Sequence, residues 1–571
     1  METRTCQNCK TDFIIEPDDF SFYEKMKVPA PTWCPKCRMI RRFSYRNERY
    51  LFRRPDFLSG KEIFSGFAPQ ANVRTIENST WYGNDWDPLE YGFGYDFSKT
   101  FFEQLYELQS KAPLPARSIY NLVNSDYSNE ASELKNCYLC FNIDYAENSA
   151  YMRKVNHMKD CLDMYECMED ELCYEGVMVD KSYQAIYSID CESCVNVWFS
   201  KGLRGCTNCF GCVNMRNKSY CFFNEQLSKE EYVERLAAID LKSYKTIKEI
   251  RAQIADFWMQ FPNKFAHNLR TLDCTGERIF DCKNVRDSYS VKSGENLRYC
   301  QDMQPTSANS YDYSVWGAGS ENIYECMTVG LGSYNVRFSF NCWENARDLD
   351  YCIYCLGCKD CFGCVSLYKK QYCIFNKQYT KEEYFELKDK IIAHMNEMPY
   401  TDTQGRVYRY GEFFPYDFSP VAYNGSIAQD FYPVSKEEAG QNGYVWHDQI
   451  SKEFSITIKS QDLPDNLNDI DDSILQEIIS CENCNKAYRI VPIELQFYKH
   501  IGLPLPRLCP DCRFVERFKF VNHPESWHRS CMCTKGNHDH AGNCPNEFES
   551  SYSYERPDIV YCESCYQQEV N

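Results

Sequence analysis

Short segments of alternating apolar and polar residues recur through the middle of the chain, most of them preceded by Asn, Asp or Ser. Examples are NCYLCFNI, NSAYMRKV, ELCYEGVMV, KSYQAIYSI and ENIYECMTV. Such alternation predicts short strands. Most segments follow one another at intervals of about 9 to 13 residues, which predicts a β-solenoid whose coils stack on one another. The fold class that we expect is therefore mixed and β-rich.

A longer repeat indicates that the middle of the chain is duplicated. GCTNCFGCVNMRNKSYCFFNEQLSKEEYVERLAAI begins at Gly205, and GCKDCFGCVSLYKKQYCIFNKQYTKEEYFELKDKI begins at Gly357. Each copy ends in a capping box that predicts a helix start, at 228–231 and at 380–383. We expect two tandem β-solenoid-like repeat modules with helical caps, flanked by N-terminal and C-terminal zinc ribbons.

Both ends of the chain carry paired CxxC motifs. One pair lies in TCQNCK and TWCPKCR and the other in SCENCNK and RLCPDCR, with 24 residues between the motifs of each pair. Tetrahedral zinc takes four thiolates, and CxxC places two of them on one tight turn. We therefore predict zinc sites, with an unmetallated thiol cluster or a single iron as alternatives, at Cys6, Cys9, Cys34 and Cys37 and at Cys481, Cys484, Cys509 and Cys512.

A third metal site is expected near the C-terminus, where Cys562 and Cys565 form another CxxC motif. The other half of this site is irregular, and imidazole competes with thiolate because it also suits zinc. The candidates are Cys544, then Cys531 in preference to Cys533, with His538 and His540 as competitors. In total we expect about three zinc ions per chain.

These motifs divide the chain into seven segments. They are a zinc ribbon with an Arg-rich helix (1–54), an aromatic connecting segment with a short helix (55–119), repeat module 1 (120–260), repeat module 2 (261–397), an aromatic and then acidic linker (398–476), zinc ribbon 2 (477–530) and zinc ribbon 3 (531–571).

The central cysteines, from Cys137 to Cys373, have a structural and a chemical interpretation. Cysteine is small and apolar enough to stack inside a coil, so we favour core packing. Residues three apart point to opposite faces of a strand, and only a chain that turns every three residues would align them. The alternatives are a redox CxxC, which lacks a thioredoxin-like context, and a metal or iron–sulfur site at Cys352, Cys355, Cys358, Cys361 and Cys364.

Composition narrows the class of protein. The 571 residues include 35 cysteines, and 16% of the residues are aromatic, too many for a disordered chain. There is no apolar run of about 18 residues that would predict a transmembrane helix, and no apolar leader that would predict export. We therefore expect a cytoplasmic protein whose cysteines are thiols or metal thiolates.

A basic stretch follows the first CxxC pair, although the formal charge of the whole chain is −19. Arginine suits planar, bidentate contacts with phosphate, and an Arg stripe beside a zinc ribbon predicts a nucleic-acid surface. Ion pairs with the acidic remainder of the chain and an acidic protein partner are the alternatives. The candidate residues, most of them on one face of a predicted helix, are Arg38, Arg41, Arg42, Arg46, Arg49 and Arg53.

Catalysis has little support in the sequence. The nine histidines are scattered, and no G-x-S-x-G, P-loop, H-E-x-x-H or dinucleotide motif is present. Complete sets of cysteine ligands imply no open coordination position on the metal. Solenoid carboxylates that cleave polysaccharides are a further possibility, but the acids show no pairing in the sequence.

The whole set of motifs resembles one family. FIIEPDDFSFYEKMKVPAPTWCPKCRMIRRFSYRNER, NCYLCFN, NCFGCVNMRNKSYCFFNEQ and RPDIVYCESCYQQEV are similar to the large cysteine-rich, multi-zinc-ribbon proteins of candidate-phyla-radiation bacteria. The resemblance covers nearly the whole chain and implies cytosolic zinc binding, without a defined biochemical role. The stretch RSCMC departs from the RxCxxC of that family, which leaves the ligands of the third site open.

We therefore expect a non-enzymatic, cytosolic zinc-binding adaptor that engages RNA or DNA through its Arg-rich N-terminal ribbon. The first alternative is a protein-binding scaffold with purely structural zinc. The second is a metal or redox protein that uses the central cysteines. The sequence indicates neither a membrane partner nor a small-molecule substrate.

Overall fold

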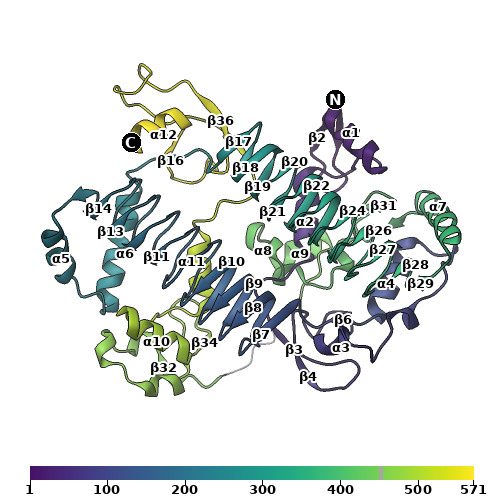
Figure 1. Cartoon of the computed structure of the whole chain (residues 1–571), viewed down its shortest axis with the longest axis horizontal. Coiled ribbons are helices and arrows are strands. Elements are labelled where there is room, and N and C mark those ends of the chain that lie inside the picture. The colour runs from purple at the N-terminus through teal and green to yellow at the C-terminus, as the bar shows by residue number, and fades with distance from the viewer. Residues whose placement is uncertain (449–453, 571) are drawn as a thin grey trace.

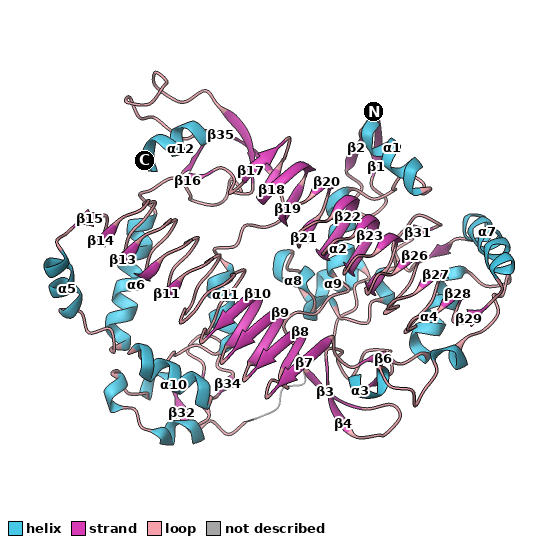
Figure 2. Cartoon of the chain, in the orientation of Figure 1, coloured by secondary structure: helices cyan, strands magenta, loops and turns pink. Residues whose placement is uncertain are grey.

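The computed structural model describes residues 1–448 and 454–570. Parallel strands form a β-solenoid, whose coils appear in Figure 1 as two stacks, with helices at their outer ends and against their sides. Figure 2 shows how loops and short strands alternate along each stack. In the described part of the chain, no helix is long and apolar enough to cross a membrane.

The first stretch of coils advances by 12 residues per turn, since Tyr138 lies opposite Ala150 and Thr207 lies opposite Ser219. Single bridges such as Leu162 to Tyr174 continue this register where no longer strand forms. Its strands are β7 (Ile119–Val123), β8 (Ser128–Lys135), β9 (Tyr138–Glu147), β10 (Ala150–Lys159), β11 (Tyr183–Ile186), β12 (Val195–Trp198), β13 (Thr207–Phe210), β14 (Ser219–Phe222) and the antiparallel β15 (Glu225–Gln226).

The second stretch has turns of 11 to 13 residues, as in Leu269 opposite Phe280, Gly276 opposite Ser288 and Tyr334 opposite Arg347. Its strands are β17 (Leu269–Leu272), β18 (Gly276–Arg286), β19 (Ser288–Lys292), β20 (Glu295–Arg298), β21 (Gln301–Met303), β22 (Ala308–Trp316), β23 (Glu321–Val329), β24 (Tyr334–Arg337), β25 (Phe340–Cys342), β26 (Arg347–Asp350), β27 (Lys359–Phe362), β28 (Gln371–Ile374) and the antiparallel β29 (Lys377–Gln378).

The coils are built from a three-residue unit that ends in the left-handed backbone region. Asp160, Asp163 and Glu166, for example, have φ of 50°, 58° and 54°. The chain therefore turns after every third residue, and the residues that follow these positions, such as Cys161 and Cys167, all point into the coil. Residues three apart therefore share a face, which the sequence allowed only for a chain that turns every three residues, because the chain does not stay extended for long enough to alternate.

Cysteine and serine have the same hydrogen-bonding role inside the coils. The Cys161 Sγ donates to the carbonyl of Lys159 at 3.1 Å and accepts from the backbone N–H of Cys173 at 3.4 Å. One turn earlier, the Ser149 Oγ donates to the carbonyl of Glu147 and accepts from the N–H of Cys161. Small side chains with a weak donor therefore fill the narrow interior and pair with its backbone groups.

Helices close the solenoid stretches and cover its sides. The two capping boxes are confirmed, at the starts of α5 (Lys229–Ala237) and α7 (Lys381–Glu397). The helices elsewhere are α3 (Asn78–Trp81), α4 (Phe101–Lys111), α6 (Tyr244–Trp258), α8 (Ile427–Phe431) and α9 (Lys436–Asn442).

Each CxxC-rich segment combines a β-hairpin with helices. The N-terminal one has β1 (Glu2–Thr5), β2 (Asp12–Ile15), α1 (Pro17–Met26) and α2 (Pro35–Phe43). The later one has β33 (Ile479–Ser480), β34 (Ala487–Tyr488), α10 (Pro492–Ile501) and α11 (Pro510–Phe518), with β32 (Ile458–Lys459) alongside. The C-terminal segment has β35 (Trp527–Ser530), β36 (Glu547–Ser550), β37 (Val560–Tyr561) and α12 (Glu563–Val570), and β37 pairs with β16 (Asn263–Lys264).

Parts of the expected linker at 398–476, whose residues 449–453 lie outside the described residues, pack into the core. Tyr408 and Phe413 are fully buried in a cluster with Trp33 of the N-terminal segment. In the acidic stretch, Leu463 and Leu467 are buried with the segment that holds α10. The polar composition of the acidic stretch suggested a solvated linker, but its leucines reach an apolar surface that only the folded chain creates.

Candidate metal centres and the arginine contacts that anchor them

The first predicted metal site is assembled as a compact group of four thiols. The ligand atoms of Cys6, Cys9, Cys34 and Cys37 all lie within 4.8 Å of one another. Cys34 is the N-cap of α2, and its backbone N–H donates to the Cys6 Sγ at 3.2 Å. The side-chain amide of Asn8 donates to the Cys37 Sγ at 3.3 Å. Donors aimed at sulfur favour the thiolate form that binds a metal ion.

The second predicted site repeats this local structure. Cys481, Cys484, Cys509 and Cys512 form a group of the same size. The N–H of Cys509 donates to the Cys481 Sγ at 3.2 Å, as Cys34 does to Cys6. Burial raises the pKa of the Cys481 thiol, but hydrogen bonds from the backbone of Cys484 and Cys509 outweigh it, and the pKa lies at about 7.

The cysteines of the third predicted site also come together, with Cys531 beside Cys544. Cys531, Cys544, Cys562 and Cys565 form a four-thiol group in which all ligand atoms lie within 4.8 Å of one another. The N–H of Cys562 again donates to the first cysteine of the set, Cys531, at 3.3 Å. Burial raises the pKa of Cys562, whereas hydrogen bonds that include the Asn546 amide lower it, to about 6. Cys533 lies outside this group and within a second one, with His538, His540 and the same Cys565.

A hairpin between β3 (Phe52–Pro55) and β4 (Glu62–Ser65) has the same turn without cysteine. Asp56 stands where Cys6 stands in the first site: it accepts the N–H of Glu77 at 2.7 Å and that of Ser59 at 2.6 Å. Burial raises the pKa of Asp56, but these backbone donors outweigh it and leave the pKa below its usual range. Hydrogen bonds here take the place that a metal ion would have, a relationship that no CxxC motif signals.

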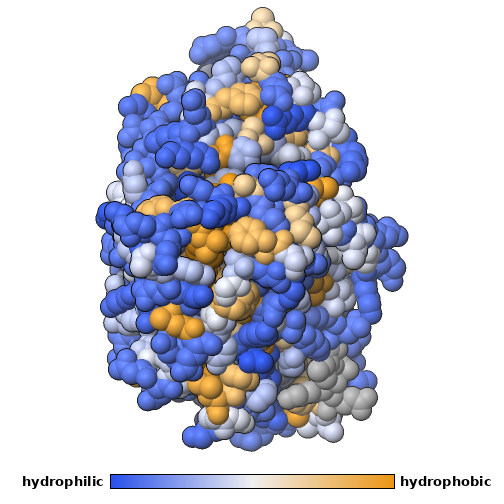
Figure 3. Space-filling view, turned by 90° about the vertical axis from the view of Figure 1, so that its right-hand side faces the viewer, coloured by the Kyte–Doolittle hydropathy of each residue, from blue (hydrophilic) through white to orange (hydrophobic). Residues whose placement is uncertain are grey.

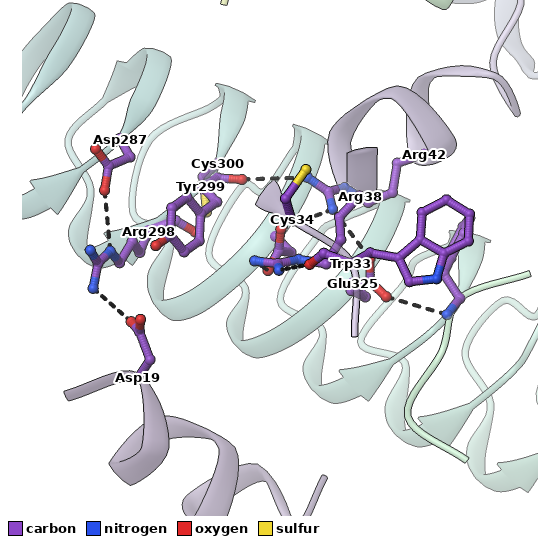
Figure 4. A network of polar contacts seen from close by, with 12 residues as sticks. Asp19, Trp33, Cys34, Arg38, Arg42, Asp287, Arg298, Tyr299, Cys300 and Glu325 are labelled. Atoms are coloured by element: carbon purple, nitrogen blue, oxygen red, sulfur yellow. Dashed lines mark hydrogen bonds and ion pairs between the residues drawn. The ribbon is translucent and has the colours of Figure 1, made fainter. Parts of the chain in front are cut away.

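The arginines of α2 are buried in the second solenoid stretch (Figure 4). Arg38 and Arg42 both contact the carboxylate of Asp312, at 2.8 and 3.1 Å, and neither exposes more than 1% of its side chain. Arg41 contacts Glu325 at 2.9 Å and Glu412 at 3.2 Å. Burial lowers the pKa of Arg41, but the two carboxylates raise it well above its ordinary value.

The helix α2 ends at Phe43, and the remaining basic residues lie beyond it. The expected single helical face therefore does not form. Arg46 is 3% exposed and contacts Glu48 and Glu130. Arg49 contacts Asp430 and Asp511. The prediction of a phosphate-binding surface is therefore wrong for Arg38, Arg41, Arg42 and Arg46, because acidic side chains of the same chain enclose them. Arg53, at 47% exposure, still faces solvent.

A matching set of contacts joins the second ribbon-like segment to the first solenoid stretch. Arg513 and Arg517 of α11 contact Asp163, both at 2.8 Å, and Arg513 also contacts Glu494 at 3.0 Å. Neither Asp163 nor these arginines had a role predicted from the sequence. A shared motif could have predicted this role. In both segments the second CxxC motif is followed directly by one arginine, and a second arginine lies four residues after the first.

The central cysteines do not belong to the groups that could bind a metal ion. Within residues 1–448 and 454–570, none of the cysteines from Cys137 to Cys373 belongs to a cluster of three or more close ligands. Their thiols instead donate to backbone carbonyls, as Cys355 does to Ile353 and Cys364. This geometry fits the core-packing interpretation.

Comparisons with known proteins assign this chain to no family. No family model matches the chain, and no curated protein matches it. A crystal structure from Desulfovibrio desulfuricans described as a "putative acetyltransferase" is 11% identical, covers 47% of this chain and 69% of its own, and aligns with a TM-score of 0.11. At that score neither a shared fold nor a shared activity follows.

Proposed function

We propose that this protein is a non-enzymatic scaffold in which about three zinc ions hold ribbon domains against two tandem solenoid modules. The surfaces of these modules would bind protein partners. The zinc ions have a structural role in this proposal, since each four-cysteine group would occupy all positions of a tetrahedral ion and leave none for a substrate.

The way in which the ribbons dock on the solenoid carries this proposal. The arginine-bearing helices of the first two ribbons each pack against the solenoid stretch that lies farther from them along the chain, an arrangement that we call crossed docking. The arginines of α2, near the N-terminus, pair with Asp312 in the second solenoid stretch. Those of α11, near the C-terminus, pair with Asp163 in the first stretch. A metal site that fixes the start of such a helix therefore also fixes how distant parts of the chain pack.

Charge favours a protein partner over nucleic acid. Four arginines of the N-terminal segment are enclosed by carboxylates, and the chain has a formal charge of −19. Nucleic-acid binding depends on cations that can reach phosphate. The face shown in Figure 3 is mostly hydrophilic, with apolar side chains interspersed. Among the outward-facing aromatic residues of the solenoid are Tyr120, at 70% exposure, and Tyr145, at 52%.

The cysteines also bear on location. None of the 35 cysteines, all of which lie among the described residues, forms a disulfide, as expected of a protein kept in a reducing compartment. We infer a cytoplasmic location on this ground.

Binding assays test the proposal directly. The purified full-length protein is titrated at low salt with random RNA and DNA pools, and a native pull-down is repeated with and without nuclease. We expect no measurable affinity for either pool, and protein partners that persist after nuclease treatment. Nucleic-acid affinity that falls with salt, or partners that nuclease removes, would overturn the proposal in favour of the adaptor hypothesis.

A further inference from the structure

Two groups of potential metal ligands overlap at the C-terminal end of the chain. One is Cys531, Cys544, Cys562 and Cys565, and the other is Cys533, His538, His540 and Cys565. In each group the ligand atoms all lie within 4.8 Å of one another. Cys565 is 1% exposed and belongs to both.

The first histidine of the second group is oriented as a metal ligand would be. The Nδ1 of His538 lies 3.0 Å from the Cys533 Sγ. Its Nε2 lies 3.0 Å from the carboxylate of Glu569 on α12, close enough for an ion pair but without the geometry of a hydrogen bond in this structure. A histidine that binds a metal through one ring nitrogen usually gives the other N–H to a carboxylate or a carbonyl.

The second histidine has the complementary arrangement. The Nδ1 of His540 lies 3.0 Å from the carbonyl of Gly542, which can only accept a hydrogen bond. This contact places the ring proton on Nδ1 and leaves Nε2 as a bare lone pair. That Nε2 is buried and has no hydrogen-bond partner among the described residues. A buried nitrogen lone pair without a donor is costly, and a metal ion would satisfy it.

We propose that Cys533, His538, His540 and Cys565 bind a fourth zinc ion, and that the Cys565 thiolate bridges it to the ion of the third four-cysteine site. Ligands about 2.0–2.3 Å from a tetrahedral zinc lie about 3.3–3.8 Å from one another. The ligand atoms of Cys533 and His538 are 3.0 Å apart, and those of Cys544 and Cys562 are 3.9 Å apart. Sharing one thiolate gives each ion four ligands from seven residues. The pair of ions also offsets the negative charge of five clustered thiolates better than one ion does.

Zinc stoichiometry of the full-length protein tests the fourth site. After dialysis against zinc-free buffer, elemental analysis and native mass spectrometry are expected to give about four zinc ions per chain. His540→Ala and Cys533→Ser are each expected to lose one ion. His528→Ala is the matched control, because His528 lies on the neighbouring β35 and its side chain is 62% exposed. About three ions in the wild type, or no loss in His540→Ala, would overturn the fourth site.

The bridge needs a separate measurement. A bridging Cys565 predicts that Cys565→Ser loses two ions, whereas Cys544→Ser loses one. If either variant fails to fold, cobalt-substituted wild-type protein decides the matter. A shared thiolate couples the two cobalt spins, so the magnetic moment per cobalt is lower in the wild type than in His540→Ala. Equal moments per cobalt would mean that the two sites share no ligand.

Discussion

Arg38 Nη2 lies 2.8 Å from Asp312 Oδ2, and neither side chain exposes more than 1% of its surface. The pair joins α2, which begins at the four-cysteine group of the N-terminal segment, to a left-handed corner of the solenoid. Burying two charges is costly unless the pairing is close and well hydrogen-bonded. Here Arg42 adds a second contact to the same carboxylate.

Removal of the shared carboxylate is expected to be strongly destabilising. Asp312→Ala leaves two buried guanidinium groups without their partner, and we expect it to lower the free energy of unfolding by about 3–5 kcal/mol. Denaturant unfolding of the zinc-loaded protein measures this loss. Glu62→Ala is the control, since Glu62 pairs with the exposed Arg53 and such surface pairs contribute about 1 kcal/mol or less. Losses of equal size in the two variants would contradict the buried network.

The crossed docking predicts where each defect appears. Asp163→Ala should raise hydrogen exchange in residues 481–518, because Arg513 and Arg517 lose their anchor in the first solenoid stretch. Exchange in residues 1–43 should stay unchanged. Asp312→Ala should give the reverse pattern. Hydrogen exchange read by mass spectrometry distinguishes the two, and a defect that spreads evenly over both segments would argue against separate anchors.

Metal removal should affect the hairpins unequally. A strong chelator should release the turns that hold Cys6 and Cys481, because bonds to a metal ion would be the strongest links among the four thiols of each group. The hairpin at residues 52–65 should keep its protection, since Asp56 closes its turn with hydrogen bonds. Limited proteolysis before and after chelation compares the three turns within one molecule. Early cleavage at residues 52–65 would show that this turn also depends on metal.

Inside the coils, cysteine should be replaceable by serine but not by valine. Cys161→Ser keeps a donor toward Lys159 and an acceptor for the N–H of Cys173, so we expect a change in unfolding free energy within about 1 kcal/mol. Cys161→Val leaves that N–H without a partner and should cost about 1–3 kcal/mol more. Denaturant unfolding measures both, and the zinc content should be unchanged in each. Loss of zinc from Cys161→Ser would contradict the packing role.

Acid should weaken the contact between the two solenoid stretches. Burial raises the pKa of Glu166, but Lys154 and Arg278 outweigh it and bring the pKa down from 4.5 to about 2. A depressed folded-state pKa contributes stability above the unfolded pKa and loses it as the pH falls through the folded one. Glu166→Gln should therefore cost about 3 kcal/mol at pH 7, and the cost should shrink between pH 4.5 and about 2. A pH-independent difference would rule out this charge pairing.

The sequence specified much of the local structure. The two 24-residue CxxC pairs predicted groups that do assemble, because a tight turn brings two sulfurs together whatever surrounds it. The capping boxes predicted the starts of α5 and α7, since the interaction spans only three residues. Regular spacing of apolar residues predicted a solenoid, because stacked coils repeat the same contacts.

The tertiary structure decided the rest. The alternating apolar segments suggested strands, but non-glycine residues in the left-handed region turn the chain every three residues, and only the closed coil compensates for that strain. The basic stretch had the composition of a nucleic-acid surface. Whether an arginine meets solvent or a carboxylate depends on residues such as Asp312 and Glu325, which are hundreds of positions away in the chain. The sequence determines that a side chain is charged, but the fold determines which group it pairs with.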